Sequence, residues 1–496
     1  MRGRYARAVQ VPAATAPEDA RPELVHVGRV TALALIAALG GFLFGYDSSV
    51  INGANKAIYA EFGITSGFFQ GFVVSIALLG SAVGAFVGGG LAQRYGRKRV
   101  MLVAAVLFLI AGIGSALPIA IWDFMGWRIV GGFAIGLAAI ISPMYIAEIA
   151  PAHMRGRLAS LFQLAIVVGI FATQVVNQIV LNAADGDASN PLGPLAAWQW
   201  MFLSMAVPAA AYFLLAFTLP ESPRYLVSIN AADRAKTVLE SIFVEPVEGK
   251  ISAIRASLDA EAKPRLSDLR AKGTGVLPIV WIGLALAVFQ QFVGINAVFY
   301  YSNLIWEAVG YPPTEAFTTS TIISVVNVVF TVVAILLVDR VGRKPLLLVG
   351  SVGMAVSLGV IAYVFESAPQ NADNAPVLTH ASGLVAVVAL NAFVAFFAAT
   401  WGPVVWVLLG EMFPNSIRAA AMSVTVMANW IANFIVSETF PELVHVGLGI
   451  AYGLFTLFAV LSFVFTWKWV KETRGAELEE MESLEGVDLD DAAATA

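Results

Sequence analysis

An all-α membrane protein is the fold class that this sequence predicts, with twelve transmembrane helices in two pseudo-symmetric six-helix bundles. The first observation is composition: the 496 residues are 59% hydrophobic and 13% charged, and the mean hydropathy is +0.80. A soluble domain carries about 25% charged residues, so a chain this apolar belongs in a bilayer. The second observation is the number of long apolar stretches, and the third is a set of motifs that occurs twice.

Apolar stretches long enough to cross a bilayer, about 20 residues each, occur six times before a polar interval and six times after it. The interval, residues 220–272, is too polar to span a membrane, and its stretches 230–242 and 247–262 are typical of short helices. The twelve predicted spans are 30–52, 68–91, 100–118, 121–146, 158–181, 197–219, 276–305, 317–338, 345–365, 383–409, 417–437 and 447–469.

These spans divide the chain into two bundles, a linker and two tails. The linker is the polar interval, and the tail after the last span is acidic and rich in alanine. The predicted boundaries are 1–29 for the first tail, 30–219 for the N-terminal bundle, 220–272 for the linker, 273–470 for the C-terminal bundle and 471–496 for the second tail.

Basic residues lie almost entirely on one face of this arrangement. If both termini are on the same side, the 29 Lys and Arg fall in the tails, the linker and the loops of that side, except for Lys56 in an opposite loop and Arg128 within a span. Cytosolic loops of membrane proteins are enriched in Lys and Arg. The sequence therefore predicts that both termini, both tails and the linker lie in the cytosol.

Three motifs occur in the same order in both halves. Arg94-Tyr-Gly-Arg-Lys98 between spans two and three recurs as Arg340-Val-Gly-Arg-Lys344 between spans eight and nine. Glu148, seven residues before Arg155, recurs as Glu411 before Arg418, and Pro220-Glu-Ser-Pro-Arg224 has a weaker counterpart in Glu472-Thr-Arg474. Parallel repeats place a binding site at their interface near the bilayer midplane, where rocking of the halves opens it alternately to each side.

Two opposite charges lie inside apolar spans. A charge at membrane depth costs about 2.5–3.5 kcal/mol on insertion scales, and such residues usually have a function. Asp47 lies in span one and Arg128 in span four. Helix rise places both residues in the outer half of the bilayer, close enough to meet. Such a pair is either a static structural ion pair or a protonatable switch, because the arginine favours the ionised carboxylate and desolvation favours the neutral one.

Span seven contains an unusual group of polar side chains. The group lies on both sides of Gly294, and several of its members share a helix face. Its members are Gln290, Gln291, Asn296, Tyr300 and Tyr301. Carboxamides both donate and accept hydrogen bonds, as sugar hydroxyls do, and they carry no charge. The group therefore suggests a site for a neutral polyol, and the alternative is hydrogen bonding between helices.

The motifs together closely resemble those of the sugar porter family of the major facilitator superfamily, over roughly residues 30–475. The similarity is greatest to bacterial sugar–proton symporters of the xylose symporter type. The matching motifs are Gly41-Phe-Leu-Phe-Gly-Tyr-Asp47, Arg94-Tyr-Gly-Arg-Lys98, Pro143-Met-Tyr-Ile-Ala-Glu148, Pro220-Glu-Ser-Pro-Arg224, Gln290-Gln291 with Gly294, Asn296 and Tyr300-Tyr301, and Trp401-Gly-Pro with Trp406.

The resemblance implies roles for single residues. It implies a gating break at Gly402-Pro403 in span ten, and it implies that Phe44 influences sugar specificity. Tryptophans near span ends, among them Trp198, are expected in the interfacial belt. The expected substrate-binding residues are Phe44, Gln163, Gln290, Gln291, Asn296, Tyr300, Asn327, Trp406, Asn429 and Trp430.

The family also implies a coupling mechanism and a gate. Protonation of Asp47 would release Arg128; mammalian glucose facilitators have Asn where Asp47 aligns, which favours proton coupling here. Salt bridges at the cytosolic ends of the spans would latch the halves together. Gln93 and Lys471 depart from the family pattern at this gate. The expected gate residues are Arg94, Arg97, Glu148, Arg155, Glu221, Arg224, Arg340, Arg343, Glu411 and Arg418.

The resulting functional hypothesis is sugar–proton symport by alternating access in a bacterial plasma membrane, with protons, a monosaccharide and lipid as partners. An uncoupled facilitator has the same site, and a non-transporting sugar sensor is a more remote alternative. We expect no enzyme activity, cofactor, metal or nucleic-acid partner, because the four histidines lie in tails or loops and there is neither an HExxH motif nor a nucleotide-binding loop. One twelve-helix chain encloses a complete pathway, which predicts a functional monomer.

Overall fold

The computed structural model describes residues 24–151, 154–260, 269–271, 275–370, 376–414 and 417–473. Most of the two predicted tails lies outside the described residues. Within them, twelve helical segments are long and apolar enough to cross a membrane, which confirms the predicted number of spans.

The N-terminal half contains the first six spans. Its last span is divided into two short helices, with Ser204 and Met205 between them. The elements are α1 (Val27–Glu61), α2 (Gly67–Tyr95), α3 (Arg97–Ala116), α4 (Ile121–Ile149), α5 (Arg155–Ala183), the hairpin strands β1 (Pro191–Leu192) and β2 (Leu195–Ala196), α6 (Ala197–Leu203) and α7 (Ala206–Thr218).

The C-terminal half contains the other six spans, and two of them are interrupted. Between the halves lie three short helices, α8 (Pro223–Ser228), α9 (Ala232–Glu240) and α10 (Glu248–Ala260), and the strands β3 (Arg270–Ala271) and β4 (Gly275–Val276). The spans are α11 (Pro278–Phe292) with α12 (Ile295–Ala308), α13 (Pro313–Val341), α14 (Arg343–Ser367), α15 (His380–Ala399) with α16 (Trp401–Met412), α17 (Arg418–Val446) and α18 (Leu448–Trp469).

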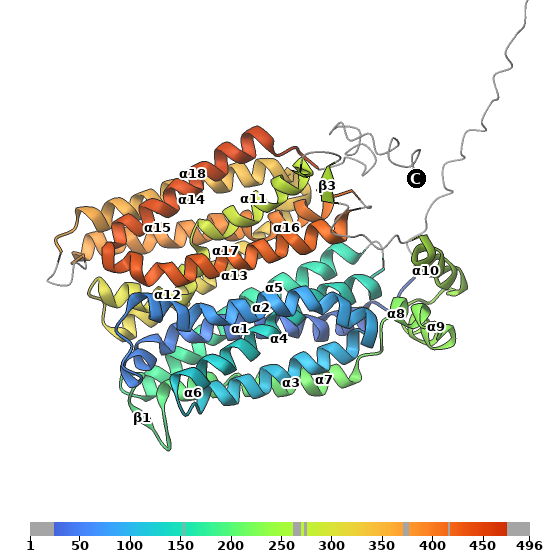
Figure 1. The fold of residues 1–496 in the computed structure, drawn as a ribbon, viewed down its shortest axis with the longest axis horizontal. Helices are drawn as coiled ribbons and strands as arrows, with labels where there is room; N and C mark the ends of the chain where they lie inside the picture. The colour runs from blue at the N-terminus through green and yellow to red at the C-terminus, as the bar shows by residue number, and fades with distance from the viewer. Residues whose placement is uncertain are drawn as a thin grey trace, which may run out of the picture.

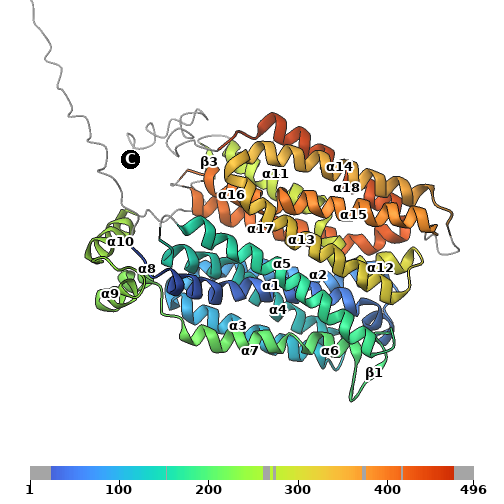
Figure 2. The ribbon, with the colours of Figure 1, turned by 180° about the vertical axis from the view of Figure 1, so that it is seen from behind.

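The two halves lie side by side with their helices roughly parallel to one long axis (Figure 1). Within the halves, α2 packs on α4, α1 on α5 and α14 on α18, while α2 on α17, α5 on α13 and α1 on α12 join the halves. The view from behind shows α5 next to α13 along this boundary (Figure 2). We call the end that carries α8–α10 the linker end and the opposite end, with the β1–β2 turn, the hairpin end.

Span seven breaks at a glycine that the conformation requires. Gly294 has φ +85°, in the left-handed region where a side chain is strained. A Cβ here would also lie 2.5 Å from the ring of Phe455. The break ends α11 after the two glutamines and starts α12 just before Asn296, so the predicted polar group is divided between two helices.

Span ten breaks two residues earlier than the sequence analysis predicted. The irregular residue is Thr400, with φ −136° and ψ −86°, and α16 begins directly after it. Gly402 and Pro403 lie inside the first turn of α16 rather than at the break. Proline is tolerated there, because the first four N–H groups of a helix have no partner within the helix.

The linker helices form a small unit of their own at the linker end. Leu226 and Val227 of α8 pack against Ala235 of α9. Helices α9 and α10 fall within the predicted stretches 230–242 and 247–262, whereas α8 was not predicted. The chain just before α1 is attached to this unit, since the His26 N–H donates to the Ile242 carbonyl at 2.8 Å. The start of the first span is thus fixed to the linker between the halves.

Candidate functional site

Asp47 and Arg128 form a buried ion pair between α1 and α4. Arg128 Nη1 lies 2.5 Å from Asp47 Oδ1, and Arg128 Nη2 donates to the Asp47 carbonyl at 3.3 Å. The two residues are 1% and 2% exposed. The guanidinium also lies 5.6 Å from the centre of the Phe202 ring, where the π face favours a cation. The structure therefore brings together the two intramembrane charges that the sequence singled out.

The pair is not fully hydrogen-bonded by the side chains around it. Within the described part of the chain, Asp47 Oδ2 and Arg128 Nε have no hydrogen-bond partner. A Cβ at Gly131 would lie only 2.8 Å from Asp47 Oδ2, so the small residue leaves space for the carboxylate. Buried polar atoms without partners are costly, and such atoms often mark functional sites.

The amides predicted to bind sugar are connected to one another in a chain between α11, α12 and α17. Asn296 Nδ2 donates to Gln291 Oε1 at 2.6 Å, and Gln291 Nε2 donates to Asn429 Oδ1 at 3.2 Å. Asn429 Nδ2 then donates to Gln290 Oε1 at 2.8 Å. Four predicted site residues from three helices therefore meet at one place.

Gln290 also connects this chain of amides to the break in span ten. Its Nε2 donates to the carbonyls of Trp401 and Gly402, at 3.0 and 3.1 Å. These are the first two residues of α16. Gln290 thus fixes the start of α16 to α11, and a ligand that engaged Gln290 would act on both helices.

The predicted aromatic residues come from four helices, α1, α12, α16 and α17. Phe44 of α1 and Trp430 of α17 are in contact across the boundary between the halves, with ring centres 5.5 Å apart. Tyr300 is buried, and its hydroxyl accepts a hydrogen bond from Asn433 at 3.5 Å. Asn327 is buried, while Gln163 and Trp406 are partly buried.

The tryptophan predicted for the interfacial belt at position 198 is instead in the core. Trp198 has 0% exposure, and its Nε1 donates to Glu61 Oε2 at 2.8 Å. It packs edge-on against Phe124 and Phe202 of the same half. That expectation was therefore wrong, because α6 turns this indole inward toward α4.

The predicted gate residues form two equivalent clusters at the linker end, one in each half. In the first, Arg97 binds Glu148 at 2.7 Å, and the Arg97 N–H donates to Glu221 at 2.8 Å. In the second, Arg343 binds Glu411 at 2.7 Å, and the Arg343 N–H donates to Glu472 at 2.9 Å. A hydroxyl completes each cluster: Ser222 donates to Glu148, and Thr473 donates to Glu411.

Both clusters tie helices of one half together. They confirm that the weak sequence repeat around Glu221 and Glu472 is a structural repeat. Of the other predicted gate residues, Arg94, Arg155 and Arg340 are exposed, Arg224 Nη1 lies 3.4 Å from Ser257 Oγ, and Arg418 Nε donates to the Phe413 carbonyl at 3.0 Å.

Hydrogen bonds that join the two halves lie at the hairpin end, and sequence reasoning missed them. Asn303 donates its N–H to Asn52 Oδ1 at 3.0 Å and its Nδ2 to the Asn52 carbonyl at 3.1 Å. Asn55 Nδ2 donates to the Tyr300 carbonyl at 2.7 Å, and Lys56 binds Glu307 at 2.8 Å. The halves are thus bonded together at this end. The signal in the sequence was asparagine within the apolar part of spans one and seven.

Comparison with known proteins identifies the same family that the motifs suggested. The family model described as "Sugar (and other) transporter" matches residues 33–484. The glucose transport protein of Synechocystis is 50% identical over 90% of this chain and 95% of the relative. The D-xylose-proton symporter of Escherichia coli K12 is 38% identical over 92% of this chain and 95% of the relative.

A third relative and a solved structure complete the comparison. The glucose facilitated diffusion protein of Zymomonas mobilis is 33% identical over 92% of this chain and 98% of the relative. The inward-open structure of the xylose transporter of Escherichia coli has a TM-score of 0.77 and 37% identity, covering 92% of this chain and 99% of that chain.

Proposed function

Because this chain belongs to the sugar porter family of the major facilitator superfamily, we propose that it carries a neutral monosaccharide, a hexose or a pentose, across the membrane together with a proton. The chain is a multi-pass membrane transporter and not an enzyme. The observation that carries the proposed coupling is the buried Asp47–Arg128 pair. One twelve-helix chain would form the functional unit.

The physical basis of the coupling is the instability of an unpaired buried charge. Removing one partner of a buried ion pair costs about 3–5 kcal/mol. Conformational states of a transporter differ by a few kcal/mol, so a change of this size can shift their populations. Protonation of Asp47 would leave Arg128 without its counter-ion, and the helices around it would then favour the other arrangement of the halves.

For the sugar site, we propose that the chain of amides exchanges its mutual hydrogen bonds for bonds to sugar hydroxyls. Each amide in the chain already has a partner, so the exchange would leave few buried polar groups unpaired. The apolar C–H face of a sugar ring packs well on an aromatic ring. The proposed contacts are Gln163, Gln290, Gln291, Asn296, Asn327 and Asn429, with Phe44, Tyr300, Trp406 and Trp430 as the surrounding wall.

We propose that the linker end faces the cytosol, on the basis of the distribution of basic residues. The halves are bonded together at the hairpin end, so this conformation would be closed toward the outside. The exposed arginines Arg94, Arg155 and Arg340, together with the clusters around Arg97 and Arg343, would latch the halves when the cytosolic side closes. Rocking between the two closures gives alternating access.

Uncoupled facilitation is the second candidate, because one relative carries the name of a facilitated diffusion protein. The two candidates are separated by proton movement in vesicles that hold the purified protein and have no imposed gradient. Glucose, xylose, galactose and inositol are added in turn outside, while the external pH is recorded. Alkalinisation with one sugar would support symport and identify the substrate, whereas sugar entry at constant pH would make the protein a facilitator.

A further inference from the structure

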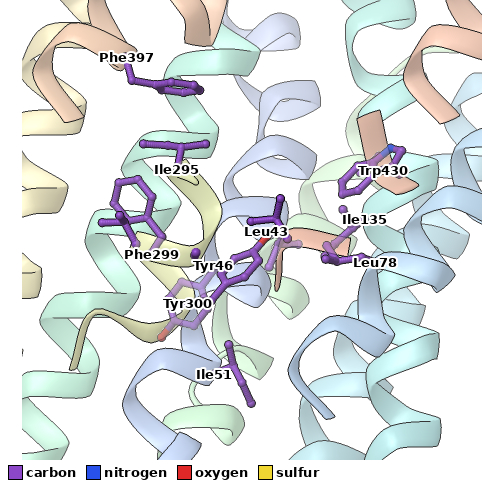
Figure 3. Packing of buried hydrophobic residues seen from close by; sticks show 14 of the residues in the cluster. Leu43, Tyr46, Ile51, Leu78, Ile135, Ile295, Phe299, Tyr300, Phe397 and Trp430 are labelled. Atoms are coloured by element: carbon purple, nitrogen blue, oxygen red, sulfur yellow. The ribbon is translucent and has the colours of Figure 1, made fainter. Parts of the chain in front are cut away.

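A small cavity lies next to the Asp47–Arg128 pair, at the boundary between the two halves. Its volume is ≈ 10 Å³, about the space that one water molecule needs. Its polar lining comes from three helices: Ser48 of α1, Arg128 of α4 and Tyr300 of α12. Its apolar lining includes Leu78 and Ile135, which Figure 3 shows next to each other in the buried cluster.

Two polar atoms of this lining have no partner among the described residues. They are Arg128 Nε, which is a donor, and Ser48 Oγ, which can donate or accept. Both residues are buried, with 2% and 9% exposure. A cavity holds an ordered water when it offers two to four polar partners, and a dry cavity is apolar. This cavity has a guanidinium and two hydroxyls in its lining.

We propose that the cavity is a binding site for one water molecule, which connects the Asp47–Arg128 pair of the N-terminal half to Tyr300 of the C-terminal half. The water accepts hydrogen bonds from Arg128 Nε and from the Tyr300 hydroxyl, which itself accepts from Asn433, and the water donates to Ser48 Oγ. Tyr300 and Ser48 are then positioning residues, which act on the pair through this water.

The site is complete only while the halves are closed at the hairpin end. Tyr300 is its one polar group from the C-terminal half, and the Asn55 side chain holds the Tyr300 backbone against α1 at 2.7 Å. When the halves separate at this end, Tyr300 moves away from Ser48 and Arg128. The hydrogen bonds around the guanidinium therefore differ between the two conformations, and the charged pair is better stabilised in the closed one.

The charged and titratable groups that face the site are few. Asp47 contacts Arg128 from α1, Arg128 comes from α4, and the Tyr300 phenol comes from α12. The remaining lining, from α2 and α4, is Val74, Ala77, Leu78 and Ile135, which do not titrate.

The water itself is tested by a high-resolution crystal or cryo-EM map of the full-length protein closed at the hairpin end. We expect a density peak within hydrogen-bonding distance of Arg128 Nε, Ser48 Oγ and the Tyr300 hydroxyl. An empty cavity in a map that resolves other buried waters would overturn the proposal. This measurement does not depend on transport, so it decides the site even if the proposed symport is refuted.

The link to the pair rests on the proposed symport and is tested by the pH profile of sugar-driven proton entry. In Ser48→Ala and Tyr300→Phe, the water loses one of its partners, so the midpoint of the profile is expected to differ from that of the wild type by about half a unit or more. The midpoint of the double variant should shift by less than the sum of the shifts of the two single variants, because both residues act through one water. Tyr300 also borders the sugar site, so each profile is recorded at saturating sugar.

Ser49→Ala is the matched control for the pH profile. Ser49 is the next residue of α1, it is fully buried with its hydroxyl unpaired among the described residues, and it does not line the cavity. Its midpoint should equal that of the wild type. Equal midpoints for Ser48→Ala, Tyr300→Phe and the wild type would overturn the link, whereas a wild type that moves no protons with any sugar refutes the symport itself.

Discussion

Asn52 and Asn303 bind each other's backbone across the boundary between the halves, and they stand 251 residues apart. Lys56 and Glu307, which form the ion pair at the same end, have the same separation. Val27 begins α1, and Pro278, the same number of residues later, begins α11. Both contacts therefore join equivalent positions of the two repeats, as expected for residues next to a pseudo-twofold axis between the halves.

The first prediction concerns the strength of this closure. Asn52→Ala removes the acceptor for the Asn303 N–H, and a net hydrogen bond is worth about 1 kcal/mol. The ratio of open to closed molecules at the hairpin end should therefore rise about fivefold. The chain has no cysteine, so spin labels at the exposed positions Ala60→Cys of α1 and Glu315→Cys of α13 report the distance between the halves and leave the Lys56–Glu307 ion pair intact.

The matched control for this distance measurement is Asn391→Ala in the same labelled background. Asn391 is also an amide in a span, but it donates to the Val387 carbonyl of its own helix at 2.8 Å. Its distance distribution should match that of the labelled parent. Identical distributions for Asn52→Ala and the parent would show that the asparagines do not hold the closure.

The second prediction concerns Gln290 and sugar affinity. Gln290→Ala removes a proposed sugar contact and also frees the start of α16 from α11. Leaving polar partners unpaired costs about 1–3 kcal/mol, so the Kd for sugar should rise about 5- to 150-fold. Calorimetric titration of the purified protein measures it. Gln70→Ala is the control, because Gln70 donates to the Ile64 carbonyl at the hairpin end; comparable affinities in both variants would exclude Gln290 from the site.

The third prediction compares the two equivalent clusters at the linker end. The Glu148 side chain is 10% exposed and that of Glu411 is 35% exposed, while their arginine partners are similarly buried. Breaking a buried pair costs about 3–5 kcal/mol, and a solvent-exposed pair contributes about 0–1 kcal/mol. Glu148→Gln should therefore lower the melting temperature more than Glu411→Gln does. The reverse order in a thermal melt would mean that burial does not govern these clusters.

The spans and the pairing of Asp47 with Arg128 could be predicted from the sequence. The spans follow from apolar length, and the helix rise gives the depth of each charge in its own span. The position of the break in span ten was not accessible in the same way. Proline suggested residues 402–403, but the chain leaves helical geometry at Thr400, and the start of α16 is held by Gln290 of another helix. The burial of Trp198 likewise depends on which face α6 turns toward α4.

The contacts between the halves were the least predictable part of the candidate site. Asn52 and Asn303 are single polar residues in apolar stretches, and the sequence does not show that a pseudo-twofold axis brings them together. The amide chain was found as a group because Gln290 and Gln291 are adjacent and Asn296 follows closely. Its fourth member, Asn429, came only from the family resemblance.

The central claim is that Asp47 couples sugar movement to a proton, and Asp47→Asn tests it most directly. The substitution keeps the size of the side chain and removes the titratable group. With the transported sugar added outside vesicles, the wild type should alkalinise the medium, and Asp47→Asn should not, while exchange of labelled for unlabelled sugar continues in both. Proton entry that persists in Asp47→Asn, or its absence in a wild type that takes up sugar, would contradict the claim.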